Sequence, residues 1–114
     1  MIKHEYVYQG TILNVVDGDT VDMQIDLGFN TSVKERFRLT GINSAEMNSK
    51  VEEEKKLATE AKAWMAQHVF SSVVIKSTKK DKYGRYLAEI FLKSDLSESL
   101  NSKLVSLGLA KKYV

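Results

Sequence analysis

The chain has 114 residues, of which 43% are hydrophobic and 28% charged, and its formal net charge is +2. This length predicts one domain spanning residues 1–114, and the small net charge does not by itself argue for nucleic-acid binding. Because there is no cysteine and there are only two histidines, disulfides and thiolate metal sites are excluded and a catalytic zinc site is disfavoured.

The first forty residues predict three consecutive strands, 6–16, 20–27 and 32–40. In 20–27 apolar and polar residues alternate strictly, as in a strand with one buried face. Asp17-Gly18 predicts a hairpin turn between the first two strands, because glycine tolerates a positive φ. Three strands linked in this way form a meander, a common start to a small barrel.

A helix is predicted next, with Ser49 as N-cap and Glu52 as its capping-box partner. An apolar stripe at helical spacing follows, which places Trp64 in the core and His68 near the end of the helix. The members of this stripe are Leu57, Ala61, Trp64, Met65 and His68.

The last third of the chain predicts strand 73–78, a basic loop 79–85, strand 86–92 and a second helix from about residue 97. One face of this helix carries Leu100, Leu104 and Leu107, and Gly108 is in the position of a C′ glycine. Three strands, a helix, two strands and a helix is the order of an OB-fold barrel. We therefore expect a mainly β, α+β protein with a five-stranded OB-fold barrel and two packed helices; an α+β sandwich is the alternative.

Polar groups that suit a hard cation occur in two of the predicted turns. A hairpin explains Asp17, but Asp19 adds a second carboxylate that is repulsive unless a cation lies nearby. Asn43 and Ser44 follow the third strand, where such residues are also routine turn formers. The carboxylate of Asp19, the side chain of Asn43 and the backbone carbonyl of Ser44 are the kind of oxygen ligands that calcium takes.

Two arginines suggest a phosphate clamp. The chain has three arginines against fourteen lysines, and Arg38 and Arg85 lie at predicted strand ends. Guanidinium groups bind phosphate through planar, bidentate donors. Glu46, close after Asn43, could accept a proton from an attacking water. The lysines of the basic loop need no such role, because a basic loop is usually solvated surface charge.

Three segments of the chain resemble staphylococcal nuclease (thermonuclease) domains. They are Val-Asp-Gly-Asp-Thr-Val at 16–21, Phe-Arg-Leu-Thr-Gly-Ile-Asn-Ser-Ala-Glu at 37–46 and Asp-Lys-Tyr-Gly-Arg-Tyr-Leu-Ala at 81–88. Residues 57–61 and 100–110 are similar to the first and second helices of that family, so the resemblance covers essentially the whole chain in the right order.

The resemblance implies an OB-type barrel and a calcium-dependent phosphodiesterase that acts on DNA and RNA. By position, Asp19 and Asn43 match two metal-binding carboxylates, and Ser44 matches the residue that offers its backbone carbonyl. Arg38 and Arg85 match the phosphate-clamping arginines, and Glu46 matches the carboxylate treated as general base. The residues that match nucleotide contacts are Lys82, Tyr83 and Tyr113.

The chain departs from the family pattern at two residues and at its end. Asn43 stands where the family usually has aspartate, so we expect calcium binding weaker by about one to two orders of magnitude. Ala45 replaces a usual proline before Glu46, and the family's third helix is expected to be missing after the second.

The leading hypothesis is a calcium-dependent endonuclease of low sequence specificity. We expect DNA or RNA substrates, preferably single-stranded or denatured, and a monomer. The alternatives are a non-catalytic OB-fold nucleic-acid-binding module, which Asn43 favours, and a small structural or protein-interaction domain. No run of about 18 apolar residues is present, so we expect no membrane association. Because the N-terminus lacks the apolar core of a signal peptide, we expect a cytoplasmic protein or the mature form of a secreted one.

Overall fold

The computed structural model describes residues 6–45, 50–80 and 85–112. In chain order, these ranges contain β1 (Tyr6–Asp17), β2 (Thr20–Gly28), β3 (Thr31–Leu39), β4 (Ile42–Ser44), α1 (Glu52–Ala66), β5 (Ser72–Lys80), β6 (Tyr86–Leu92), α2 (Leu100–Ser106) and β7 (Ala110–Lys112). No helix among the described residues is long and apolar enough to cross a membrane.

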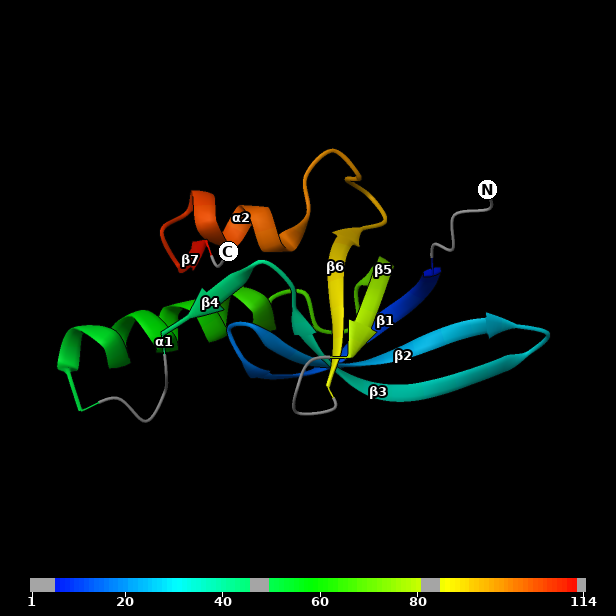
Figure 1. Cartoon of the computed structure of the whole chain (residues 1–114), viewed down its shortest axis with the longest axis horizontal. Coiled ribbons are helices and arrows are strands. Elements are labelled where there is room, and N and C mark those ends of the chain that lie inside the picture. Colours follow the sequence, from blue (N-terminus) through cyan, green and yellow to red (C-terminus); the bar gives the residue numbers. More distant parts are fainter. Residues whose placement is uncertain (1–5, 46–49, 81–84, 113–114) are drawn as a thin grey trace.

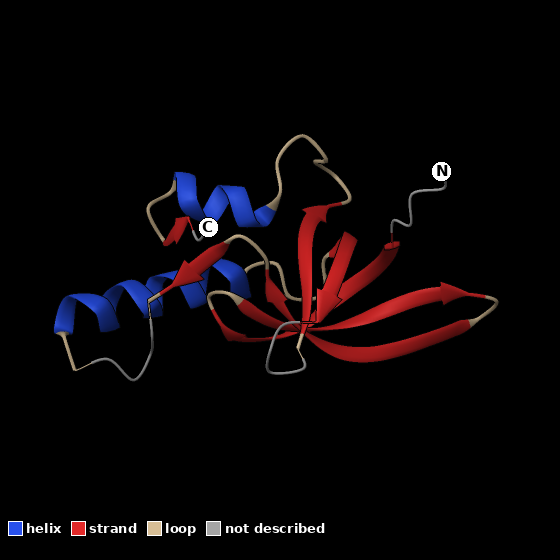
Figure 2. Ribbon diagram, in the orientation of Figure 1, coloured by secondary structure: helices blue, strands red, loops and turns tan. Residues whose placement is uncertain are grey.

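Five of the strands close into a barrel in the order β1-β2-β3-β6-β5 (Figure 1). Every neighbouring pair is antiparallel except β3 and β6, which run parallel where the barrel closes. The two helices lie together at one end of the barrel, as Figure 2 shows. The predicted five-stranded OB-fold barrel of an α+β protein is thereby confirmed, and the sandwich alternative is wrong because the sheet closes on itself.

The β2–β3 hairpin projects beyond the barrel at the end away from the helices (Figure 1). The predicted alternation of β2 holds within the barrel, where Val21, Met23 and Ile25 are buried. The same face continues to Leu27, which is 41% exposed because no other part of the barrel covers the hairpin there.

A small second sheet was not predicted from the sequence. Strand β4 pairs antiparallel with β7, and the two form a two-stranded sheet separate from the barrel. Sequence analysis placed Asn43 and Ser44 in a polar turn and predicted no strand at residues 110–112. Segments of three residues carry too short a pattern to show strand periodicity, so this pairing follows from tertiary structure.

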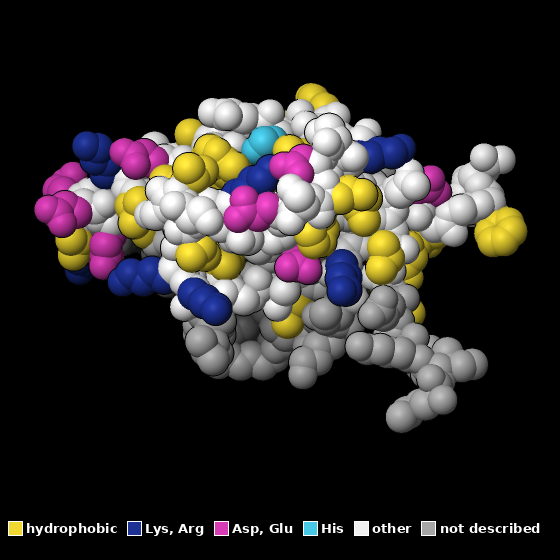
Figure 3. All heavy atoms as spheres, turned by 90° about the horizontal axis from the view of Figure 1, so that it is seen from above, with side chains coloured by type: hydrophobic (Ala, Val, Ile, Leu, Met, Phe, Trp, Pro, Cys, Tyr) yellow, Lys and Arg dark blue, Asp and Glu magenta, His cyan; other side chains and the backbone are white. Residues whose placement is uncertain are grey.

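Helix α1 begins later than the capping box predicted. Val51, with φ −86° and ψ 120°, is the N-cap residue, so the prediction that Ser49 caps the helix is wrong. Glu52 and its two acidic neighbours still occupy the first turn, where they complement the helix dipole. Figure 3 shows acidic side chains gathered at one end of the molecule.

Trp64 and His68 lie together at the end of α1. Trp64 was predicted in the core, but it is half-buried and packs against the core rather than within it. His68 lies just after the helix, with its ring edge-on to that of Trp64 at 4.8 Å. Burial, with a smaller contribution from the charge of Lys103, lowers the pKa of His68 below its usual value. His68 therefore fits the predicted role of a residue at the helix end.

Helix α2 begins at Leu100, with the hydroxyl of Ser99 accepting a hydrogen bond from the backbone N of Ser102 at 3.0 Å. It ends in the predicted glycine motif, because Gly108 has φ 74° and donates to the carbonyl of Val105. The prediction for Leu107 was wrong: this residue is the C-cap and is 57% exposed, because the helix has already ended.

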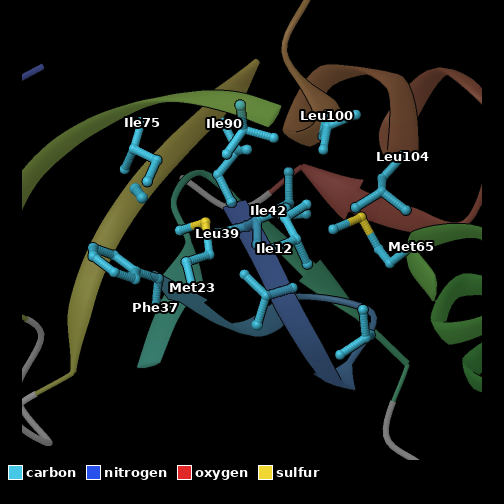
Figure 4. Packing of buried hydrophobic residues seen from close by; sticks show 14 of the residues in the cluster. Ile12, Met23, Phe37, Leu39, Ile42, Met65, Ile75, Ile90, Leu100 and Leu104 are labelled. Atoms are coloured by element: carbon cyan, nitrogen blue, oxygen red, sulfur yellow. The ribbon is translucent and has the colours of Figure 1, made fainter. Parts of the chain in front are cut away.

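The core fills the barrel and extends to the helices (Figure 4). Ile12, Leu39 and Ile90 are fully buried within the barrel. Met65 from α1 and Leu104 from α2 are also fully buried and belong to the same cluster. The helices therefore cover one end of the core and exclude water from it.

Truncating Leu104 tests this packing. We expect Leu104→Ala to lower the free energy of unfolding by about 2–5 kcal/mol, because it leaves a cavity between α2 and the barrel. Leu107→Ala is the matched control, and an exposed leucine should change stability by about 0.5 kcal/mol or less. Urea unfolding followed by tryptophan fluorescence measures both, and equal losses would contradict the burial of only one leucine.

Candidate functional site

The turn between β1 and β2 packs against both α1 and β4. A Cβ atom on Gly18 would lie 2.7 Å from the Cβ of Ala61 and 3.0 Å from that of Ser44. Gly18 is not among the glycines with a positive φ, so the reason predicted for this glycine is wrong. The turn needs glycine because only a residue without a side chain allows this close approach, and the approach brings Asp19 to β4.

Asp19 is held by hydrogen bonds from three backbone or side-chain groups. Its carboxylate accepts one from the backbone N of Ser44 and one from the hydroxyl of Thr20, both at 3.1 Å. Its backbone carbonyl accepts one from the N of Leu39 at 2.8 Å. The side chain is only 15% exposed, so its carboxylate is largely shielded from water and is fixed against the last residue of β4.

Arg38 connects this carboxylate to β4. Its Nη2 atom donates a hydrogen bond to Oδ1 of Asn43 and lies 3.6 Å from Oδ2 of Asp19. Its Nη1 atom donates to the carbonyl of Leu39 at 3.2 Å. The Arg38 side chain is 15% exposed. Its guanidinium group therefore bridges the carboxylate of Asp19 and the amide oxygen of Asn43 at a position largely shielded from water.

Gly41 turns the chain from β3 into β4 with a φ of 78°, which glycine adopts without strain. The turn is fixed from α2 by Asn101, a residue that sequence analysis did not select. The Nδ2 atom of Asn101 donates to the carbonyls of Thr40 at 2.8 Å and Ala88 at 3.1 Å. Its Oδ1 atom accepts from the backbone N of Ile90 at 3.1 Å.

Asn101 could have been found in the sequence from its position. It lies three residues before Leu104, within the apolar face of a helix, where an amide must find hydrogen-bond partners if it is buried. The residue is only 4% exposed. Its side chain therefore links α2 to β6 and to the end of β3, and it positions the connection that carries Asn43 and Ser44.

The remaining arginines occupy different places. Arg36 projects from the outer surface of β3, where its Nε atom lies 2.8 Å from Asp22 and its hydrogen bond lowers the pKa of that carboxyl. Arg85 is half-buried and directly precedes β6. Leu87 pairs with Arg38 across the β3–β6 ladder, and Arg85 lies two residues before Leu87, directly ahead of the strand.

The structure thus brings together four of the predicted site residues: Asp19, Arg38, Asn43 and Ser44. The other predicted residues besides Arg85 lie outside the described residues, namely Glu46, Lys82, Tyr83 and Tyr113.

The oxygen ligands at this site match calcium in type but carry little negative charge. Calcium takes carboxylate and amide oxygens, which Asp19 and Asn43 offer next to each other. Both oxygens face the guanidinium of Arg38. Within the described ranges, no three or more His, Cys, Asp or Glu side chains form a cluster suited to a metal ion.

Residues 36–114 match the family described as staphylococcal nuclease homologue. The chain belongs to the staphylococcal nuclease homologue family. This membership confirms the resemblance and supports nuclease or nucleic-acid-binding activity.

A relative of this staphylococcal nuclease homologue is found in Methanocaldococcus jannaschii, the "Uncharacterized protein MJ1439". The two are 29% identical over an alignment 133 residues long, which covers 97% of this chain. The chain spans 61% of the length of that relative.

Replacing Asn101 tests whether its amide fixes the site. We expect Asn101→Ala to lower the free energy of unfolding by about 2–4 kcal/mol, since buried backbone groups lose their partners. Ser106→Ala, on the exposed surface of the same helix, is the control and should change it by about 0.5 kcal/mol or less.

Thermal unfolding measures the stability of both variants. Amide hydrogen exchange at Ile90 provides a direct second readout of the lost hydrogen bond. Unchanged protection of this amide in Asn101→Ala would contradict the assignment.

Proposed function

We propose that this protein is a nuclease that hydrolyses phosphodiester bonds of DNA, and of RNA as a second substrate, with low sequence specificity and calcium as cofactor. The observation that carries the proposal is the cluster in which the Arg38 guanidinium meets the oxygens of Asp19 and Asn43. A shielded guanidinium beside oxygen ligands can hold a phosphate and a hard cation next to each other. Family membership supports the same activity class.

In this proposal, Asp19, Asn43 and the backbone carbonyl of Ser44 hold the metal. When bound, calcium polarises the phosphate and offsets its charge. Asp19 is already fixed by its hydrogen bonds to Ser44 and Thr20, so it needs little reorganisation. Because Asn43 contributes no charge, we expect weak binding and a requirement for high calcium concentrations.

The two arginines act on the phosphate. Arg38 donates hydrogen bonds to a phosphate oxygen and stabilises the charge that develops there in the transition state. Arg85, two residues before the cross-strand partner of Arg38, would supply the second guanidinium. For this, Arg38 must exchange its hydrogen bond to Asn43 for one to the phosphate.

Glu46 is the proposed acceptor of the proton from the attacking water. It follows β4 by two residues in the sequence. Lys82, Tyr83 and Tyr113 are proposed to bind the nucleotide, by charge and by stacking on its bases. Stacking needs unpaired bases, so we expect single-stranded or denatured substrates to be preferred.

A non-catalytic nucleic-acid-binding module remains the second candidate. The observation that favours it is that Arg38 already occupies the oxygens of Asp19 and Asn43. Because the Arg38 guanidinium already offsets the charge of Asp19, the site can bind phosphate without a metal ion. The two candidates differ in whether calcium converts bound DNA to product.

The test is hydrolysis of a labelled single-stranded oligonucleotide by the protein in about 10 mM calcium, a concentration above the dissociation constants of weak calcium sites. We expect cleavage that EDTA abolishes. Binding to the same oligonucleotide is measured by fluorescence anisotropy in EDTA. Binding without any cleavage in calcium would favour the binding module. A protein that neither binds nor cleaves the oligonucleotide would contradict both candidates.

Arg38→Gln provides the matched variant in this experiment. We expect cleavage to fall about 10³-fold or more, as for other phosphate-clamping arginines. Calcium affinity, measured by titration calorimetry, should be unchanged or higher, because the variant removes a positive charge 3.6 Å from the Asp19 carboxylate. Near-equal turnover by both proteins would contradict the clamp.

A further inference from the structure

The β4–β7 sheet places a lysine beside the candidate site. Lys111 is the partner of Asn43 in the antiparallel register, and both residues are exposed. Directly opposed residues in such a ladder project from the same face, with Cβ atoms about 4.5–5.5 Å apart. The Lys111 side chain therefore starts next to the Asn43 amide, on the face where Arg38 donates its hydrogen bond.

The position of Lys111 is fixed by buried groups on both sides of it. Ala110 is 7% exposed and pairs with Ser44, whose backbone N is bound to Asp19. Leu109 donates from its backbone N to the carbonyl of Leu104 at 2.9 Å and so ties β7 to α2. A short strand held in this way presents its side chains from a defined backbone position.

Lys111 carries a positive charge that no described side chain neutralises. Among the residues that the structure describes, none forms an ion pair or a side-chain hydrogen bond with Lys111. Its cross-strand partner Asn43 is neutral, and the carboxylate of Asp19 already faces Arg38. An ammonium group next to a guanidinium is unfavourable unless an anion lies between or beside them.

We propose that Lys111 binds a backbone phosphate of the nucleic acid, next to the phosphate that Arg38 holds. This inference rests on the proposed function and adds a residue to it. Lysine binds phosphate as a point charge without geometric selection, so Lys111 contributes affinity and orients the strand along β4 and β7, but it does not select sequence.

Lys112 offers a matched control. It is the next residue on β7, it is also exposed, and it pairs with Ile42 instead of Asn43. Because side chains alternate along a strand, it projects from the opposite face. Lys111→Gln and Lys112→Gln therefore remove the same charge at nearly the same place, but only the first removes it from the face of the site.

The experiment measures the affinity of both variants and the wild type for a fluorescent single-stranded DNA oligonucleotide in EDTA, over a series of salt concentrations. We expect Lys111→Gln to weaken binding about two- to fivefold at moderate salt, as for an exposed ion pair. The slope of log K against log salt should fall in magnitude by about 0.7, the value for one contact with a single strand. Lys112→Gln should leave the slope unchanged.

Equal effects of the two variants would overturn the assignment, because both would then act only through the overall charge. The use of EDTA separates this result from the proposed function. Cleavage by the wild type in calcium, together with unaltered binding by Lys111→Gln, would overturn the role of Lys111 and leave the nuclease intact. A wild type that neither binds nor cleaves DNA would overturn both.

A second comparison tests the neutrality of Asn43. In an Asn43→Asp background a carboxylate stands opposite Lys111 and competes with the phosphate for it. We therefore expect Lys111→Gln to change binding less in that background than in the wild type. An equal or larger change would contradict the cross-strand contact.

Discussion

The fold depends on how the chain leaves the barrel at the end of β3. There the parallel pairing with β6 stops, and the backbone must turn away while its polar groups stay satisfied in a buried environment. The buried amide of Asn101 provides the solution, because it binds Thr40 and Ala88 through one atom and Ile90 through the other. A helix that covers the core thus also determines where β4 begins.

The candidate site is built from this exit of the chain. Strand β4 has only three residues, too few to hold itself in place, and it is fixed by groups from three directions. The Asp19 carboxylate binds the backbone of Ser44, the guanidinium of Arg38 binds Asn43, and β7 pairs along the other edge. The close packing of Gly18 against α1 makes the first of these contacts possible.

The sequence predicted the parts of the molecule that carry long patterns. The alternation in β2 and the order of strands and helices were sufficient for the barrel, and Gly108 marked the end of α2. The motifs around Asp19 and Arg38 identified residues that the fold does bring together.

Three features that the sequence did not predict correctly have a common physical origin. The register of β4 with β7, the role of Asn101 and the reason for Gly18 all depend on contacts between segments far apart in the chain. Hydrophobic periodicity does not encode such contacts. The capping box at Ser49 matched a local rule, but the helix starts after Val51, so the local rule did not decide the boundary.

In the proposed function, Asp19 and Asn43 hold a cation whose affinity is limited by the missing charge at position 43. A calcium titration of single-stranded DNA cleavage by the wild type and Asn43→Asp tests this directly. We expect the variant to reach half-maximal activity at about 10- to 100-fold less calcium, because ligand charge sets the affinity of such sites. Identical calcium midpoints in the two proteins would contradict it.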